Sequence, residues 1–134
     1  MITMAITRVL LADDDSLVRM AIKRVLADYP EVEVVGEAAT GVEAVSSVER
    51  LRPHIVIMDI RMPGMDGIAA AREIKDKYPE TQIIGLSEYA YGYHADAMLK
   101  AGALAVYKKS NAPEELYAAI KKVIGSQDNS GPST

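Results

Sequence analysis

The chain has 134 residues, which suits one domain with a single core, and its 49% hydrophobic and 25% charged residues are an ordinary globular composition. It contains no cysteine, which excludes a disulfide framework and a cysteine-based zinc site and fits a cytoplasmic location. The formal net charge of −4 argues against direct binding of nucleic acid, and the short apolar runs argue against a membrane span.

The first half of the chain alternates apolar runs typical of strands with apolar stripes at helical spacing. Pro30 and Pro53 each end a helical stretch, and Thr40 with Glu43 has the spacing of a capping box. The run HIVIMD is so continuously apolar that it indicates a parallel sheet covered on both faces. The expected elements are a strand over Ile6–Ala12, a helix over Ser16–Tyr29, a strand over Val32–Ala38, a helix over Thr40–Leu51 and a strand over His54–Asp59.

The second half of the chain continues the same alternation. Pro79 stops one helix, Gly102 is placed to cap another, and Gly125 is expected to close the last. The expected elements are a loop over Arg61–Gly67, a helix over Ile68–Tyr78, a strand over Gln82–Ser87, a helix over Tyr93–Ala103, a strand over Leu104–Lys109 and a helix over Ala112–Gly125.

Five strand–helix units in strict alternation predict an α/β fold, a single (βα)5 doubly wound parallel sheet with right-handed crossovers. The expected strand order is 2-1-3-4-5. Residues 6–125 form the predicted domain, and residues 1–5 form an N-terminal extension. Residues 126–134 are polar and rich in turn formers, so they are interpreted as a tail or as the start of a linker to a further domain.

Polar side chains stand at the carboxyl ends of four predicted strands, where sites form in such sheets. Asp13 and Asp14 end the first strand, Asp59 the third, Ser87 the fourth and Lys109 the fifth. Converging carboxylates repel one another, and an all-oxygen acidic cluster suits Mg²⁺ best. Acids, a hydroxyl and a lysine around such an ion predict phosphoryl transfer with an aspartate as nucleophile.

Four stretches together resemble the receiver domain of two-component response regulators, in particular the LuxR/FixJ-like (NarL-type) class. They are VLLADDDSLVR, IVIMDIRMPGMDG, IIGLS and AGALAVYKKS. The resemblance covers residues 6–124 and implies a flavodoxin-like, chemotaxis-regulator-like fold.

The resemblance implies a metal site and a phosphate acceptor. Asp59 corresponds to the acceptor, Asp14 to the direct metal ligand and Asp13 to a ligand acting through water. The backbone carbonyl of Arg61 corresponds to the third protein ligand. The implied ion is Mg²⁺, with Mn²⁺ as a substitute.

The resemblance also implies the signalling role. Ser87 corresponds to the switch hydroxyl and Lys109 to the family's lysine. The phosphate would come from a sensor histidine kinase or a phosphotransfer protein. The chain would catalyse its own phosphorylation and dephosphorylation, and is not an enzyme in the usual sense. Phosphorylation would shift the surface formed by the fourth helix, the fifth strand and the fifth helix. That surface would then bind an output domain, another protein or a second copy of the chain as a homodimer. The implied setting is transcription regulation in bacteria.

Two positions depart from the family pattern. The family often has an aromatic residue three positions before the lysine, where this chain has Val106; the neighbouring Tyr107 is expected to face the other way. The activation signal is therefore expected to pass through Ser87 and the tyrosine-rich loop. Ser110 replaces a proline after Lys109, so a trans peptide bond is expected there.

Several polar residues near these motifs have simpler explanations. Asp15 is expected to cap the first helix, Asp66 to form a turn, and Lys108 to face away from Lys109 at a sheet edge. His54 is expected only to start a strand, and His94 to lie on an exposed helix face without metal partners.

Tyr89, Tyr91 and Tyr93 allow two interpretations. They either pack their rings on the sheet edge or form a partner-binding or gating surface beside the site. In the second interpretation, Tyr89 and Arg61 shield or guide the water that attacks the acylphosphate.

Two other functions compete with the phosphate receiver. Asp13 and Asp15 fit the Asp-x-Asp fragment of aspartate-nucleophile phosphatases, but Leu17 stands where that class has threonine. A pseudo-receiver would keep the fold without the chemistry, and such chains typically lose the acids or the lysine that this chain keeps.

Overall fold

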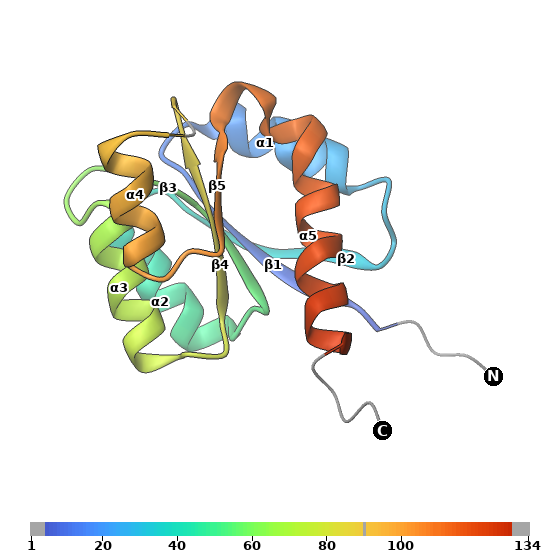
Figure 1. Ribbon diagram of the computed structural model, residues 1–134. Coiled ribbons are helices and arrows are strands. Elements are labelled where there is room, and N and C mark those ends of the chain that lie inside the picture. Colours follow the sequence, from blue (N-terminus) through green and yellow to red (C-terminus); the bar gives the residue numbers. More distant parts are fainter. Residues whose placement is uncertain (1–4, 90, 130–134) are drawn as a thin grey trace.

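The computed structural model describes residues 5–89 and 91–129. Within them, strands and helices alternate along the chain (Figure 1). The elements are β1 Thr7–Ala12, α1 Ser16–Leu26, β2 Val32–Ala38, α2 Gly41–Leu51, β3 Ile55–Asp59, α3 Gly67–Lys77, β4 Gln82–Ser87, α4 Tyr93–Lys100, β5 Ala105–Lys108, the 3₁₀ turn η1 Lys109–Asn111 and α5 Ala112–Asn129.

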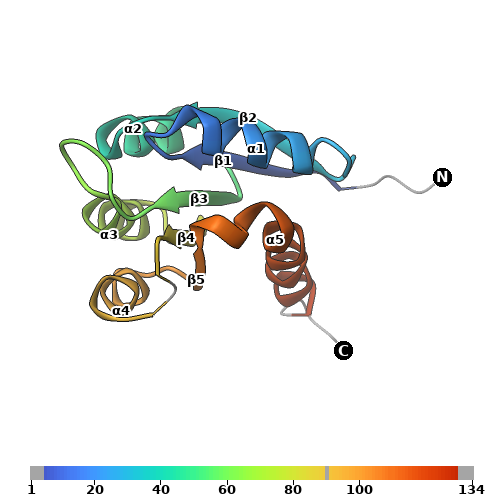
Figure 2. The ribbon, with the colours of Figure 1, turned by 90° about the horizontal axis from the view of Figure 1, so that it is seen from above.

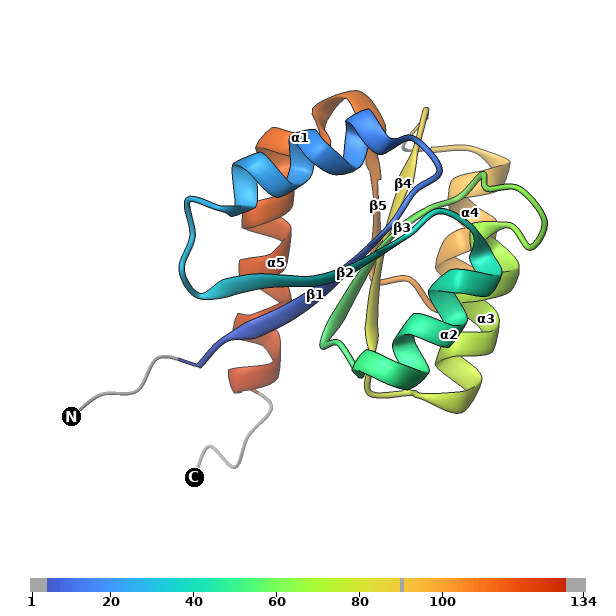
Figure 3. The same ribbon diagram turned by 180° about the vertical axis from the view of Figure 1, so that it is seen from behind.

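The five strands form one parallel sheet in the order β2-β1-β3-β4-β5, which confirms the predicted doubly wound fold. The sheet lies between two helical layers, with α1 and α5 on one face and α2, α3 and α4 on the other (Figures 2 and 3). Asp59 ends the central strand β3, so the predicted site lies between two strands that are paired on both sides.

Alternate residues of each strand point into two separate apolar clusters. In β1, Val9 and Leu11 pack with α1 and α5, whereas Leu10 packs with α2, α3 and α4. At the edge strand β5, Val106 packs with the α2–α4 cluster and Tyr107 with the α1–α5 cluster, so the prediction that these two face opposite ways is confirmed.

Short polar side chains begin three of the helices. Asp15 Oδ1 accepts a hydrogen bond from Leu17 N–H at 2.9 Å, and Asp66 Oδ1 accepts one from Ala69 N–H at 2.8 Å. Thr40 caps α2 in the same way. These caps satisfy amide groups that have no partner inside the helix, which confirms the structural role predicted for Asp15 and gives Asp66 a structural role as well.

Most element ends that differ from the predictions differ by one residue, but α4 ends at Lys100 instead of Ala103, because Gly102 leaves the helical conformation with φ of 120°. Helix α1 ends at Leu26 instead of Tyr29, because the N–H groups of Asp28 and Tyr29 bond to the carbonyls three residues back and form a tighter turn that leads to Pro30. Strand β5 ends at Lys108, because its pairing with β4 stops where β4 ends at Ser87. Gly125 does not close α5, which continues through Asn129, since each added residue gains a helical hydrogen bond and no proline intervenes.

Two tyrosines join α5 to the loop between α1 and β2, near the amino end of the sheet. The rings of Tyr29 and Tyr117 stack with centroids 3.4 Å apart, and the Tyr117 hydroxyl donates a hydrogen bond to Glu31. The backbone carbonyl of Glu31 in turn accepts from Thr7 N–H at the start of β1. This contact ties the last helix to the first strand far from the carboxyl ends of the strands.

Among the residues that the structure describes, no helix combines the length and apolarity needed to cross a membrane. Their peptide bonds are all trans, including the bond between Lys109 and Ser110, as predicted. Gly102 has φ of 120° just past α4, which confirms its predicted place at the end of that helix.

Candidate phosphorylation site

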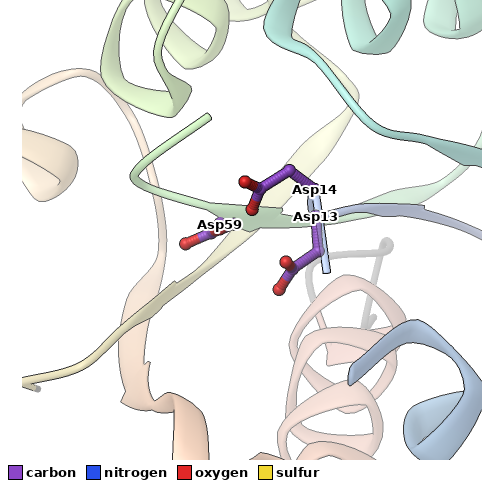
Figure 4. A group of neighbouring side chains, drawn as sticks. All are labelled: Asp13, Asp14 and Asp59. Atoms are coloured by element: carbon purple, nitrogen blue, oxygen red, sulfur yellow. The ribbon is translucent and has the colours of Figure 1, made fainter. Parts of the chain in front are cut away.

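Three carboxylates meet where β1 and β3 end. Asp13 and Asp14 follow β1, and Asp59 is the last residue of the neighbouring β3 (Figure 4). Each residue offers a carboxylate oxygen within 4.8 Å of an oxygen of the other two. Asp13 and Asp59 are buried whereas Asp14 is exposed, so the cluster has one side open to solvent.

Lys109 is the cation that faces this cluster. Its Nζ lies 3.1 Å from Asp59 Oδ2 and 3.1 Å from Asp13 Oδ2. Only the contact with Asp59 has hydrogen-bond geometry. Asp13 Oδ2 is therefore buried and paired in charge, but it has no hydrogen-bond partner among the described residues. A buried carboxylate oxygen without a hydrogen-bond partner is available as a ligand for a cation.

Burial and mutual repulsion act together on the two buried acids. Burial, and then the Asp13 charge, raises the pKa of Asp59 to about 6, although Lys109 opposes the change. Burial also raises the pKa of Asp13. Burial by itself would lower the pKa of Lys109, but Asp59 and Asp13 outweigh it and raise that pKa. At neutral pH the site therefore holds an ionised Asp59 beside an ammonium group.

The loop after β3 folds back on Asp59 and fixes its backbone. Gly67 N–H donates to the carbonyl of Ile60 at 2.8 Å, and Arg61 N–H donates to Asp59 Oδ1 at 3.3 Å. A Cβ atom on Gly67 would lie 2.0 Å from the carbonyl oxygen of Asp59, so only glycine allows this approach. Asp59 thus has close contacts with this loop at both its side chain and its main chain.

An open cavity of about 440 Å³ lies over the cluster and gathers most of the predicted site residues. Ser87, at the end of β4, lines it, and the Ser87 hydroxyl accepts a hydrogen bond from Tyr89 N–H at 3.3 Å. The cavity is lined by Asp14, Asp59, Ile60, Arg61, Ser87, Glu88, Tyr89, His94 and Lys109. The structure therefore brings Asp59, Ser87, Lys109 and Arg61 to one place, with Asp13 beneath them.

The sequence did not indicate that two further residues border this cavity. His94, expected only on an exposed helix face, is exposed but also lines the cavity from the first turn of α4, and Glu88 lines it from the preceding loop. The place of His94 on the cavity wall depends on how α4 packs, which local periodicity does not encode.

Other polar residues have structural roles, as predicted. His54 precedes β3 and its Nδ1 accepts a hydrogen bond from Arg8 N–H at 2.9 Å, and Lys108 is exposed on the edge strand. Asp15 caps α1 and lies outside the acidic cluster, so the Asp13–Asp15 pair expected of an aspartate-nucleophile phosphatase is not assembled.

The three loop tyrosines project into solvent. Tyr89, Tyr91 and Tyr93 are 63%, 78% and 81% exposed. Tyr89 and Tyr91 also line a groove with Tyr107 and Lys108 of the edge strand β5, so both interpretations of these tyrosines stay predictions. The Tyr89 and Tyr91 rings lie 6.5 Å apart, and only Tyr89 borders the cavity over Asp59.

A family model described as the response regulator receiver domain matches residues 9–121. The chain belongs to this family. Its role is therefore that of a phosphorylation-accepting signal receiver in a two-component system. The predicted fold and family are confirmed, and the phosphatase alternative finds no support.

Curated relatives of this receiver domain are longer proteins. The uncharacterized transcriptional regulatory protein YhcZ of Bacillus subtilis is 42% identical over 109 residues, which are 81% of this chain and 51% of the relative. Response regulator UvrY of Escherichia coli is 37% identical over 119 residues, 89% of this chain and 55% of the relative. The chain thus spans about half the length of these relatives.

Solved receiver domains have the same fold. The non-phosphorylated receiver domain of the stress response regulator RcsB from Escherichia coli superposes with a TM-score of 0.84 at 28% identity, covering 90% of this chain and 95% of that one. The response regulator domain of Thermotoga maritima CheB gives 0.81 at 30% identity, covering 87% and 95%.

Proposed function

We propose that Asp59 is the residue of this receiver domain that accepts the phosphoryl group. The observation that carries the proposal is the position of Asp59. Its buried carboxylate ends the central strand, accepts a hydrogen bond from Lys109 and lines a cavity. A carboxylate oxygen of Asp59 attacks phosphorus, forming the P–O bond while the P–N bond of a phosphohistidine breaks and its electron pair remains on the imidazole.

The residues present fit a divalent cation. Three carboxylates and one ammonium group leave two negative charges in excess, and the buried Asp13 Oδ2 has no hydrogen-bond partner in the described chain. We propose that Asp14 and Asp59 bind Mg²⁺ directly, Asp13 through water, and Arg61 through its backbone carbonyl, with Mn²⁺ as a substitute. When bound, the ion supplies positive charge that offsets the charge on the phosphoryl oxygens.

Ser87 and Lys109 are the proposed partners of the remaining phosphoryl oxygens. The Lys109 ammonium group already reaches Asp59, and Ser87 borders the same cavity. Together with Asp59 they allow the chain to catalyse its own phosphorylation and dephosphorylation without being an enzyme in the usual sense. Retention of all these groups favours a competent receiver over a pseudo-receiver.

The proposed output is a change in the surface formed by α4, β5 and α5. Ser87 precedes the segment that leads into α4, and Lys109 begins the turn that leads into α5. Since Val106 stands where the family often has an aromatic switch, the signal is proposed to pass through Ser87 and the tyrosine loop.

The partners follow from the family and its named relatives. A sensor histidine kinase or a phosphotransfer protein is the proposed phosphate donor, and a homodimer, another protein or an output domain beyond residues 6–125 is the proposed target. One relative is named as a transcriptional regulatory protein, so transcription regulation in the bacterial cytoplasm, without DNA contact by this domain, is the proposed setting.

Intact-mass spectrometry after incubation with acetyl phosphate and Mg²⁺ tests the proposal. Wild type and Asp76→Asn, which changes an exposed acid on α3, are expected to gain one phosphate, and Asp59→Asn none. Omission of Mg²⁺ is expected to abolish the gain. A folded wild type that gains no phosphate, with a cognate kinase also tried, would favour the pseudo-receiver.

A further inference from the structure

Arg19 on α1 reaches from its helix to the segment that carries the acidic cluster. Its Nη1 donates a hydrogen bond to the backbone carbonyl of Asp13, and its Nε donates one to Glu37 Oε1 at 2.8 Å. The Arg19 side chain is only 17% exposed, so this charge-assisted contact is shielded from water. One guanidinium group thus links α1, β2 and the residue after β1.

Glu37 is a fixed anchor for that guanidinium group. It lies on β2 opposite Leu11 of β1, and its Oε2 accepts a second hydrogen bond from Lys23 Nζ at 2.8 Å. Lys23 and Arg19 together hold the pKa of Glu37 below its usual range, so the anchor stays charged at neutral pH. Arg19 is therefore held in place independently of the acids that it supports.

Repulsion between carboxylates acts on the Asp13–Asp14 segment that Arg19 contacts. Asp13 and Asp14 are adjacent, and Asp59 brings a third carboxylate within 4.8 Å. Its other restraints include the bond from Asp13 N–H to the Ala38 carbonyl at 2.9 Å, the bond from Asp15 N–H to Asp13 Oδ1 at 2.8 Å and the ion pair of Asp13 Oδ2 with Lys109 Nζ at 3.1 Å. Arg19 holds the remaining polar group of the Asp13 backbone, its carbonyl, and with it the peptide plane from which Asp14 projects.

We propose that Arg19 is a positioning residue for the divalent-cation site. Anchored by Glu37, it fixes the Asp13–Asp14 peptide so that both carboxylates face the cation before it binds. The inference deepens the proposed function and rests on it. Residues that orient metal ligands typically contribute 10- to 100-fold to metal affinity.

Calorimetric titration of the whole protein with Mg²⁺ tests this role. Arg19→Gln is expected to raise the Mg²⁺ Kd roughly tenfold, and Arg19→Lys, which keeps the charge but has a single donor group, to raise it less. Glu37→Gln is expected to raise the Mg²⁺ Kd to a value between those of wild type and Arg19→Gln. Arg24→Gln is the matched control, because Arg24 is exposed on the same helix and makes no side-chain hydrogen bond within the described residues.

Thermal unfolding with EDTA and with Mg²⁺ separates positioning from general stability. A positioning role reduces the increase in Tm that Mg²⁺ produces in Arg19→Gln and in Glu37→Gln, whereas a purely structural role lowers Tm equally in both conditions. The inference is overturned if wild type binds Mg²⁺ and both variants bind it within twofold as well. Wild type that binds Mg²⁺ but takes no phosphate on Asp59 overturns the proposed function alone, and wild type that binds no Mg²⁺ overturns both.

Discussion

Lys109 Nζ lies 3.1 Å from carboxylate oxygens of both Asp13 and Asp59, although the three residues come from different strand ends. A single ammonium group thus offsets charge on the two buried acids of the site. Removing it leaves two buried carboxylates without a counter-charge, which is more costly than the loss of a surface ion pair.

Lys109→Met is therefore expected to lower the free energy of unfolding at pH 7 by about 2 kcal/mol, a value reduced from that of a fully buried pair because Lys109 is partly exposed. It should also slow phosphate acceptance from acetyl phosphate. Urea unfolding in EDTA measures the free energy of unfolding, and mass spectrometry measures the rate at which phosphate is gained. Lys108→Met is the matched control on the exposed edge of β5, and an equal loss in both variants would contradict the assignment.

Asp59→Asn is expected to stabilise the protein at pH 7 in the absence of divalent cations, by about 2 kcal/mol. The pKa of Asp59 is about 6 in the folded protein and near 3.8 when unfolded, so the folded state holds the proton more tightly. Raising the pH from about 4 to 6 therefore removes a contribution of Asp59 to the free energy of unfolding, and the raised pKa of Asp13 acts in the same direction. The lowered pKa values of Glu31 and Glu37 act in the opposite direction, so the contribution of Asp59 is the difference between wild type and Asp59→Asn.

Urea unfolding at a series of pH values in EDTA measures this dependence. Between pH 4 and 6, the free energy of unfolding of wild type should fall relative to that of Asp59→Asn. Asp76→Asn should keep the wild-type slope. A wild-type free energy of unfolding that rises through this window relative to that of Asp59→Asn would show that the Lys109 contacts outweigh burial.

Gly67→Ala is expected to damage the site through the backbone. The added Cβ would lie 2.0 Å from the Asp59 carbonyl oxygen, so the β3–α3 loop must move, at a cost of about 2–3 kcal/mol. The Mg²⁺ affinity should fall as well. Gly125→Ala is the control, since its Cβ meets nothing within 4 Å and the change should be neutral or stabilising by up to about 1 kcal/mol. Unaltered Mg²⁺ binding in Gly67→Ala would show that the loop relaxes without moving the acids.

Tyr89→Ala is expected to speed loss of phosphate from Asp59. Tyr89 borders the cavity over Asp59, and removing its ring opens a path for water. We expect roughly a two- to fivefold faster loss, which is about 0.5–1 kcal/mol of barrier. Mass spectrometry after removal of the phosphate donor gives the rate. Tyr91→Ala, outside that cavity, should leave it unchanged, and an unchanged rate in Tyr89→Ala would exclude shielding by this ring.

The sequence predicted the residues that meet at the candidate site better than it predicted the residues that hold them in position. Asp13, Asp59, Ser87 and Lys109 were predictable because each ends a strand or directly follows one, and the ends of parallel strands meet at one edge. Arg19 was not, because a helical arginine has the same local pattern whether it faces solvent or a backbone carbonyl. The missed place of His94 and the missed continuation of α5 past Gly125 likewise depend on packing and on helix propagation.

The stacked pair of Tyr29 and Tyr117 also has an optical consequence. The chain has no tryptophan and no phenylalanine, so its near-ultraviolet signals come from seven tyrosines. Two ring systems 3.4 Å apart couple their electronic transitions, so they contribute a circular dichroism signal that depends on the contact of α5 with the α1–β2 loop. Tyr89, by contrast, stands at the cavity over Asp59. The unlabelled protein thus has tyrosines that report both on the contact of α5 with the α1–β2 loop and on the cavity over Asp59.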